Sequence, residues 1–384
     1  MKKNILLLDT SFSAKPIYDY LISTGAEVFV IGGNPSDYLA KSVKNYINID
    51  YSKISEVQLK INTLEIDFIV PGGNDLSYKI CSELNELSRF INIDSIENNE
   101  IINNKEKFRK FSVKNGLHVP KMISRNNLTK YLPVIVKPVD AYSGHGISII
   151  RKDDKDHLDS AINSASEASK SGKYMIEEYV EGQLFSHSAF VSNGKIEIDF
   201  IVKEFCFVNK YAVDTSHVVY DFDQGVLNQI RNDIAKIVQK LGLVDGLMHT
   251  QFILKDKSLW IIEVTRRCPG DLYSMLIETS TGFPYAEYYS KPFIGEENQY
   301  STLEINPTPI LRHTITIRDE GIFESLNFKS NIDIIKYVPL AIAGDRIHRS
   351  PYGRIGLLFS KSNSESNMID LVENFQNGKV YSVN

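Results

Sequence analysis

A lysine, a serine and two glycines stand close together in the segment PVIVKPVDAYSGHGISI, residues 133–149. Lys137 lies in an apolar run that predicts a buried strand, and a buried ammonium group requires an anionic partner. Ser143, Gly144 and Gly146 follow in a loop, where glycine lets backbone N–H groups approach and bind phosphate oxygens. The segment therefore predicts a phosphate clamp. An edge-strand lysine before an ordinary turn is the alternative, and one Gly-x-Gly does not decide between them.

Two adjacent glutamates, Glu177 and Glu178, end a second apolar run, just before Tyr179 and Val180. Consecutive strand residues face opposite sides, so one carboxylate should point inward and the other toward solvent. An inward glutamate beside backbone amide and carbonyl groups could recognise an adenine, the backbone pairing with N1 and N6 and the carboxylate with N6. A charged edge strand is the alternative, which this segment taken alone favours.

A third segment places polar side chains at every second position of two consecutive strands: His249 and Gln251, then Glu263, Thr265 and Arg267. A tight hairpin sets Gln251 opposite Glu263. Glu263 has apolar sequence neighbours, a poor place for a carboxylate without a cation. Because Mg²⁺ takes one or two carboxylates plus substrate phosphates, the pattern favours a magnesium site over a plain charged strand.

Other candidates carry less information. His217 and His249 could contact substrate or remove a proton, although a lone histidine is more often a hydrogen-bonded structural residue. Arg346, Arg349 and Arg354 gather in a turn-rich stretch, where they could hold an anionic substrate or form salt bridges on a solvated loop. The sequence leaves that choice open.

The elements that position these residues begin with a repeated strand–turn–helix pattern, which predicts a parallel sheet with helices on both faces. Ligands bind beyond the carboxyl ends of such strands, so the turn at residues 72–75 is a candidate ligand edge, with a helix N-cap at Asn74 or Asp75 as the alternative. No GxGxxG follows the first strand, which argues against a dinucleotide fold. The expected strands are Asn4–Leu8, Glu27–Ile31 and Asp67–Val70, and the expected helices Pro16–Ser23 and Ile54–Leu64.

Beyond residue 94 the pattern changes. The polar, Asn-rich segment Asp94–Asn104 is expected to be a linker, and Gly116 suits the end of the helix that follows it. Antiparallel strands are expected from Leu132 onward, and the last eighty residues predict a small α+β unit. The expected helices are Lys105–Asn115, Asp156–Ser171 and Asp223–Leu241, and the strands Val134–Val139, Ile147–Arg151, Tyr174–Val180, Leu184–Val191, Ile196–Phe207, Met248–Leu254 and Leu259–Val264.

Composition excludes several classes of protein. At 384 residues the chain suits two or three domains, and its 42% hydrophobic and 24% charged residues are ordinary for a soluble globular protein. A net charge of −5 without basic runs gives no footprint for nucleic acid, and no apolar stretch approaches the roughly 20 residues of a membrane span. Three scattered cysteines, Cys81, Cys206 and Cys268, predict reduced thiols in a cytoplasmic protein.

The three polar segments, occurring together and in this order, resemble the ATP-grasp superfamily, and the resemblance covers most of the chain. It implies an α/β fold: an N-terminal Rossmann-like domain at 1–95, an ATP-grasp domain at 105–298 with a lid subdomain at about 116–180, and a C-terminal α+β domain at 299–384.

The resemblance also implies site residues. Adenine recognition falls to Glu177 and the backbone of Glu178, Tyr179 and Val180, the ligands of Mg²⁺ (or Mn²⁺) are Gln251 and Glu263, and Arg267 holds substrate carboxylate or the transferring phosphoryl group. Two positions depart from the family: Leu184 replaces a ribose-binding glutamate, with Gln183 or Glu181 as substitutes, and Thr265 replaces a metal-binding asparagine, still offering an oxygen. The nucleotide phosphates are assigned to Lys105, Lys137 and the loop Ser143–Gly146.

The implied activity is ATP-dependent ligation: a carboxylate becomes an acyl phosphate and is passed to an amine, with Arg267, Lys137 and His217 as catalytic candidates. The expected partners are a small-molecule acid and amine, and the architecture also admits a homodimer. One alternative is a bicarbonate-activating enzyme like carbamoyl-phosphate synthase or biotin carboxylase, suggested by Gln251. Another is a nucleotide-binding regulator with weak catalysis, suggested by Leu184 and Thr265.

Overall fold

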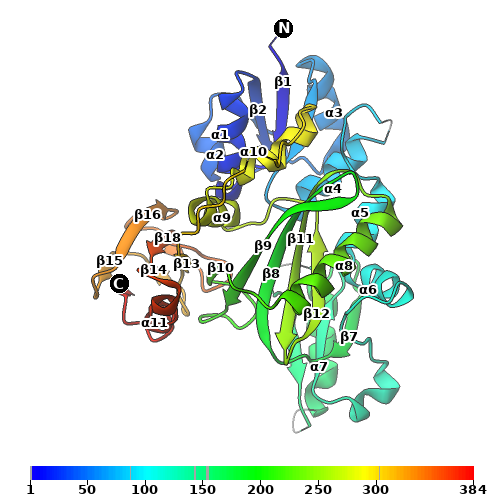
Figure 1. The fold of residues 1–384 in the computed structure, drawn as a ribbon, viewed down its shortest axis with the longest axis vertical. Helices are drawn as coiled ribbons and strands as arrows, with labels where there is room; N and C mark the ends of the chain where they lie inside the picture. Colours follow the sequence, from blue (N-terminus) through cyan, green and yellow to red (C-terminus); the bar gives the residue numbers. More distant parts are fainter. Residues whose placement is uncertain (1, 87, 142–143, 153–154, 302) are drawn as a thin grey trace.

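The computed structural model describes residues 2–86, 88–141, 144–152, 155–301 and 303–384. At one end lies a parallel sheet with strand order β3-β2-β1-β4, flanked by helices (Figure 1). This confirms the predicted parallel sheet and adds one strand, β3. The elements are β1 (Asn4–Leu8), α1 (Lys15–Ser23), β2 (Glu27–Gly32), α2 (Tyr38–Ser42), β3 (Tyr46–Asn48), α3 (Ile54–Thr63), β4 (Phe68–Pro71) and α4 (Asp75–Leu84).

The segment expected to be a linker is instead a helix, α5 (Ile96–Asn103). Ser95 caps it by accepting a hydrogen bond from the Asn98 N–H, and Ile102 is buried. The asparagines hid this helix, because they lower helix propensity while the cap and one apolar contact suffice to fix it. Helix α6 (Lys105–Lys114) follows, and Gly116 has a φ of 63°, as the predicted helix end requires.

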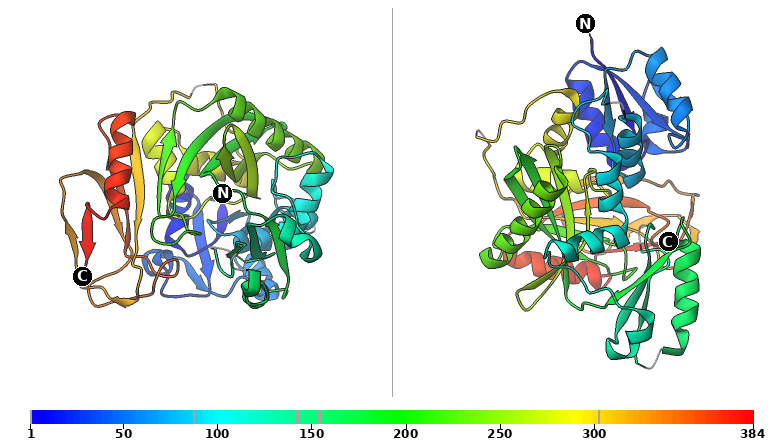
Figure 2. Two further views of the ribbon diagram at one scale, coloured as in Figure 1. Left: turned by 90° about the horizontal axis from the view of Figure 1, so that it is seen from below. Right: turned by 90° about the vertical axis from the view of Figure 1, so that its right-hand side faces the viewer.

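A small three-stranded antiparallel sheet, the lid sheet, has the order β6-β5-β7 and packs against α7. Its core contains Val134, Val136 and Ile176. The lid sheet lies at the end of the molecule opposite the parallel sheet (Figures 1 and 2). Its elements are β5 (Val134–Pro138), β6 (Ser148–Ile150), α7 (Leu158–Ala168) and β7 (Tyr174–Glu178).

The largest layer is an eight-stranded sheet with the order β12-β11-β8-β9-β10-β13-β18-β16. Its last three strands come from the C-terminal region, so the sheet continues across the boundary predicted at residue 298 through the pairing of β10 with β13. The long helix α8 (Gln224–Leu241) packs on one face. The strands are β8 (Gln183–Ser192), β9 (Lys195–Phe205), β10 (Thr215–Val219), β11 (Gly246–Lys255), β12 (Ser258–Thr265), β13 (Ile310–Ile315), β16 (Asp333–Pro339) and β18 (Gly356–Lys361).

The C-terminal region also holds helix α11 (Glu365–Gln376) and four short strands, β14 (Gly321–Ile322), β15 (Leu326–Phe328), β17 (Arg346–Ile347) and β19 (Tyr381–Val383). In both views of Figure 2, α11 lies beside the C-terminal strands. The part of the chain that the structure describes contains no helix both long and apolar enough to cross a membrane.

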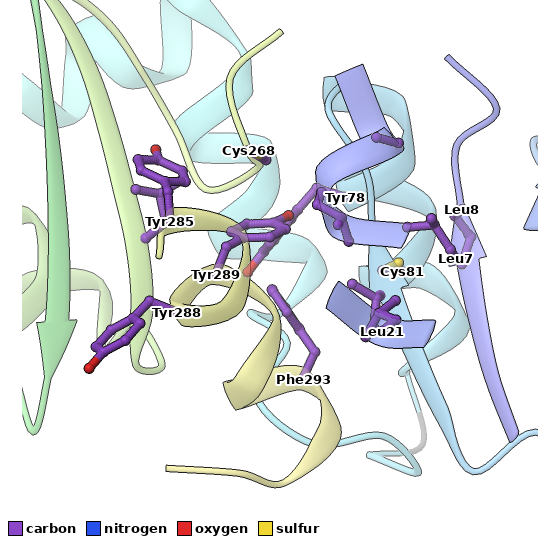
Figure 3. Packing of buried hydrophobic residues seen from close by; sticks show 14 of the residues in the cluster. Leu7, Leu8, Leu21, Tyr78, Cys81, Cys268, Tyr285, Tyr288, Tyr289 and Phe293 are labelled. Carbon is purple, nitrogen blue, oxygen red and sulfur yellow. The ribbon is translucent and has the colours of Figure 1, made fainter. Parts of the chain in front are cut away.

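A shared aromatic core joins the parallel sheet to the large sheet. Two helices after β12, α9 (Tyr273–Thr281) and α10 (Tyr285–Ser290), supply much of it. Tyr289 packs edge-on against Phe293 at 5.3 Å between ring centroids and donates a hydrogen bond to the Pro71 carbonyl, while Tyr78 of α4 lies beside it (Figure 3). The carboxyl ends of β1 and β4 are thereby held against the large sheet.

Candidate active site

Lys137 is buried in the lid sheet, as its apolar neighbours predict, and its partner is Glu177. The register of β5 and β7 sets Ile135 opposite Glu177, which places the Glu177 side chain within reach of Lys137. Arg109 of α6, which is 0% exposed, also binds Glu177, with Nε 2.5 Å from Oε1. Glu177 is thus the inward member of the predicted pair, and its carboxylate is shared by two cations.

This group carries an excess of positive charge, because two buried cations share one carboxylate. Burial lowers the pKa of Lys137 to about 8, even though Glu177 acts in the opposite direction. Burial would also raise the pKa of Glu177, yet Lys137 and Arg109 hold it below its ordinary value. The remaining positive charge suits an anion such as a phosphate.

The outward member of the pair, Glu178, accepts a hydrogen bond from the Lys121 N–H at 2.9 Å. The backbone N–H groups of Glu178 and Tyr179 are already bonded to the carbonyls of Lys121 and Pro133. The Val180 N–H, in contrast, has no acceptor among the described residues. Of the predicted adenine-recognising donors, Val180 is therefore the one that remains available.

The glycine loop lies between other parts of the chain. Gly144 has a φ of 74°, and a Cβ added there would lie 2.5 Å from the Tyr211 Cβ. Gly146, with a φ of 67°, packs equally tightly against α7. His145 between them lies edge-on against Tyr352 of the C-terminal region, 4.7 Å between ring centroids. Ser143, the first residue predicted for this loop, lies outside the described residues.

The predicted pairing of Gln251 with Glu263 is confirmed by the register of β11 and β12. The hairpin turn has a positive φ at both central residues, Asp256 (48°) and Lys257 (65°), which matches the twist of the two strands. Glu263 keeps 44% of its side chain exposed and lies 3.9 Å from the Lys105 Nζ. Lys105, the first residue of α6 and a predicted contact of the nucleotide phosphates, therefore lies beside the predicted metal ligands.

The other end of β12 is held by the parallel-sheet domain. Arg267 donates to both carboxylate oxygens of Asp75, at 2.9 and 3.3 Å, and the Thr265 hydroxyl donates to the same carboxylate at 3.0 Å. Burial opposes ionisation of Asp75, but Arg267 keeps its pKa below the ordinary value. Asn74 caps α4, so the turn at residues 72–75 both begins a helix and reaches the site.

Glu204 on β9 was not predicted, although it lies beside Gln251. The Gln251 Nε2 donates to its carboxylate at 2.8 Å, which turns the amide oxygen of Gln251 away from Glu204. Burial raises the pKa of Glu204 to about 7, against the opposing effects of Ser186 and Arg312. A carboxylate within an apolar strand was the signal that singled out Glu263, and the same signal was present here.

The remaining predicted polar residues fall in three places. His249 is buried beside Ser188, with its Nδ1 3.0 Å from the hydroxyl, and burial lowers its pKa to about 3. Gln183 uses its amide to bind the carbonyl of Glu204 at 2.7 Å. His217 neighbours Ser216 on β10 and so faces the opposite side of the sheet from the row containing Glu204. The catalytic role predicted for His217 does not fit this position.

The three C-terminal arginines are not one cluster. Arg354 binds the Asp271 carboxylate at 3.1 Å near the domain junction, while Arg346 pairs with Glu320 at the surface and Arg349 is exposed. Arg312, which was not predicted, is buried on β13. Its Nη1 donates to the Asp271 carbonyl at 3.0 Å, so two arginines meet at Asp271.

Comparison with known proteins agrees with this arrangement. Residues 130–275 match the family model described as an ATP-grasp domain. The carbamoyl phosphate synthase large chain of Thermotoga petrophila is 23% identical over 252 residues, which cover 63% of this chain and 22% of that one. This chain therefore spans less than a quarter of that relative's length.

Two solved structures share the whole fold. The L-amino acid ligase from Bacillus licheniformis aligns with a TM-score of 0.80 and 17% identity, covering 99% of this chain and 98% of that one. Phosphoribosylglycinamide synthetase from Anaerococcus prevotii aligns with a TM-score of 0.76 and 20% identity, covering all of both chains. At these identities the likeness concerns the fold.

Proposed function

Because residues 130–275 match the ATP-grasp domain and the whole chain shares the fold of an L-amino acid ligase and of a phosphoribosylglycinamide synthetase, we propose that it belongs to the ATP-grasp superfamily and is an ADP-forming ligase that activates a small carboxylic acid and couples it to an amine. The nucleotide would bind between the lid sheet and the large sheet. Its phosphates would meet Lys137 and Lys105, and its adenine would meet the backbone at Val180. The excess positive charge around Glu177 supports the phosphate contacts.

Gln251 and Glu263 would hold Mg²⁺. The donor set fits: Glu263 is half exposed and supplies a carboxylate, and the Gln251 amide has its oxygen free because its nitrogen binds Glu204. No group of three His, Cys, Asp or Glu side chains arranged for a metal occurs within the described ranges. The remaining ligands would therefore be phosphate oxygens and water, which is how Mg²⁺ commonly binds. The ion supplies charge neutralisation at the transferring phosphoryl group.

Two transfers make up the reaction. An oxygen of the substrate carboxylate attacks the γ-phosphorus of ATP, the bond to the β-phosphate oxygen breaks, and ADP leaves. The amine then attacks the acyl carbon, loses a proton, and inorganic phosphate departs. Arg267, held by Asp75, is suited to stabilise the negative charge of the carboxylate and of the phosphoryl group. The observation that carries this proposal is the placement of Lys105 beside the Gln251–Glu263 pair.

Release of ADP by the purified protein tests the proposal, with Mg²⁺-ATP and pools of carboxylic acids and amines. We expect turnover only when an acid and an amine are present together. Replacing Glu263→Gln or Lys137→Ala should lower kcat by about 100-fold or more while the fold persists, since each removes charge stabilisation at the phosphoryl group. Full activity in either variant would refute the assigned site.

A bicarbonate-activating enzyme is the second candidate. Gln251 at the first metal position and the match to carbamoyl phosphate synthase over 63% of this chain favour it. In the same assay, bicarbonate alone would then support ADP release without any organic acid. Nucleotide binding without turnover in any pool would instead favour a regulator with weak catalysis.

A further inference from the structure

Two opposite charges lie on one row of the large sheet without touching. Ser216 of β10 pairs with Glu204 of β9 on one side and with Arg312 of β13 on the other. Side chains directly opposite in a ladder share a face, so the three side chains point the same way. Two strand spacings of ~4.8 Å set the Cα atoms of Glu204 and Arg312 roughly 10 Å apart. The row faces the same side as Gln251, through the pairings of Gln251 with Ser186 and of Ser186 with Val202.

Arg312 lacks an anionic partner although it is only 1% exposed. Its Nε donates to the Ser216 hydroxyl at 2.9 Å, and its Nη1 donates to the Asp271 carbonyl at 3.0 Å and to the Thr314 hydroxyl at 3.2 Å. Its Nη2 has no acceptor, and no carboxylate lies within 4.0 Å of the guanidinium, among residues that the structure describes. Glu204 and Asp214 act on Arg312 only over a longer range, so an anion in direct contact would complete the hydrogen bonding of the buried guanidinium.

Glu204 is the counterpart of Arg312, at 2% exposure. Its carboxylate accepts a hydrogen bond from the Gln251 Nε2, and within the described part of the chain no cation lies within 4.0 Å of it. The buried hydroxyls of Ser186 and Tyr273 face the Glu204 carboxylate and favour its ionised form. Among the described residues, the end of the row beside Gln251 thus offers a buried carboxylate with polar neighbours and no cation in contact with it.

We propose that this row is the binding site for the zwitterion of an α-amino acid, with its carboxylate on Arg312 and its amino group on Glu204. The inference rests on the proposed function and names the class of amine that the enzyme accepts. It places the amino group beside Gln251 and Glu263, where the acyl phosphate would form, and points the carboxylate toward the C-terminal region. An amine without a carboxylate, such as an amino sugar, would leave Arg312 unpaired.

The experiment begins by separating the two proposals. Hydroxylamine is added with Mg²⁺-ATP and pools of carboxylic acids, and hydroxamate formation reports the acyl phosphate without any natural amine. With an acid found in this way, each of the twenty common amino acids is compared with its α-carboxamide as acceptor. We expect the preferred amino acid to exceed its amide in kcat/KM by about 100-fold, because only the amino acid presents a charged partner to Arg312.

Variants then test which residue is responsible for the preference for an amino acid over its amide. In Arg312→Gln the preference for the amino acid over its amide, measured as the ratio of their kcat/KM values, should disappear; Arg312→Lys should restore part of this preference. Arg346→Gln is the control, because Arg346 is a C-terminal arginine whose side chain is 67% exposed; this variant should keep the full preference for the amino acid. If Arg312 only supported the Asp271 loop, both acceptors would decline together.

Two outcomes overturn different claims. Equal use of amino acids and amides by the unaltered protein would refute the zwitterion site while leaving the ligase intact. Absence of hydroxamate with every acid would refute the proposed function instead. If Arg312→Gln fails to fold, the comparison of acids with amides in the unaltered protein still decides.

Discussion

Arg109, Lys137 and Glu177 lie buried together where α6 meets the lid sheet, and they carry one net positive charge when all three are ionised. Burying this uncompensated positive charge costs free energy, and a bound anion lowers that cost. A nucleotide phosphate would supply that anion, so affinity for the nucleotide should depend on Lys137 keeping its proton. Since burial lowers the pKa of Lys137 to about 8, this dependence falls within an accessible range of pH.

We therefore expect the Kd for ADP to rise as pH increases through about 8. The lysine is charged below that pH and binds phosphate; above it, binding must take up a proton, which costs up to about tenfold in Kd per pH unit. Isothermal titration calorimetry from pH 7 to 9.5 measures the effect. Lys137→Arg is the control because arginine stays charged, while the titration of the nucleotide itself is common to both proteins. Parallel profiles for the two proteins would contradict the assignment.

Single residues were predictable where their type was unusual for their sequence surroundings. Lys137 and Glu263 stood out as charges in apolar strands, and the two-residue turn fixed the register of Gln251 with Glu263. Arg109 could not be recognised in this way, because it lies in an ordinary charged helix and becomes part of the site only through tertiary packing. Arg312 similarly acquires its role from the pairing of β10 with β13, a contact between strands about a hundred residues apart.

Among the elements, the glycine loop between β5 and β6 has little room for an added side chain. The alanine methyl in Gly144→Ala would meet Tyr211 at 2.5 Å, in a backbone conformation that costs L-residues about 1–2 kcal/mol. We expect kcat/KM for ATP to fall about tenfold or more, corresponding to ~1.4 kcal/mol, because the loop can no longer pack against Tyr211.

Gly172→Ala is the matched control for this change. Gly172 lies in the same subdomain with a φ of 69°, and nothing lies within 4 Å of an added Cβ. It therefore introduces the backbone strain without the clash. Steady-state kinetics of the two variants should differ; equal losses would mean that the strain, and not the contact with Tyr211, is responsible.

Most elements could be predicted from periodicity, and the misses have physical causes. Helix α5 was missed because asparagine-rich sequence masked a Ser95 cap. Strands β3 and β10 were missed because they are short and gain their stability from neighbouring strands. The C-terminal strands were expected to form a unit of their own, since nothing in their sequence specifies that β13 joins β10.

On the scale of the whole molecule, the site draws on segments from three parts of the chain. Asp75 comes from the parallel-sheet domain, Arg267 from the end of β12, and Arg312 from the C-terminal region. Asp75 holds both Arg267 and Thr265, so one carboxylate fixes the end of the strand that carries Glu263. The orientation of Arg267 therefore depends on how the domains pack.

Replacing Asp75→Asn tests this dependence. The neutral amide cannot hold Arg267 in both contacts, and we expect kcat to fall by about 10–100-fold with a modest loss of stability, since a partly buried charge pair is broken. Asp19→Asn is a control in the same domain, where it breaks an exposed pair with Lys15 worth about 0–1 kcal/mol. Kinetics and thermal melting of both variants separate activity from folding, and unchanged turnover in Asp75→Asn would rule out the role.

The pairing of β10 with β13 has a bearing on how such a protein can change over time. A recombination junction placed near residue 298 would give these two strands different origins, and a mismatched pair would expose rows of unpaired N–H and C=O groups that recruit other chains. Exchange of the C-terminal region between relatives is thus viable only when the incoming β13 matches the twist and register of the resident β10. The acceptor-binding end of the molecule should accordingly diverge by substitution in place, and seldom by the wholesale replacement of a module.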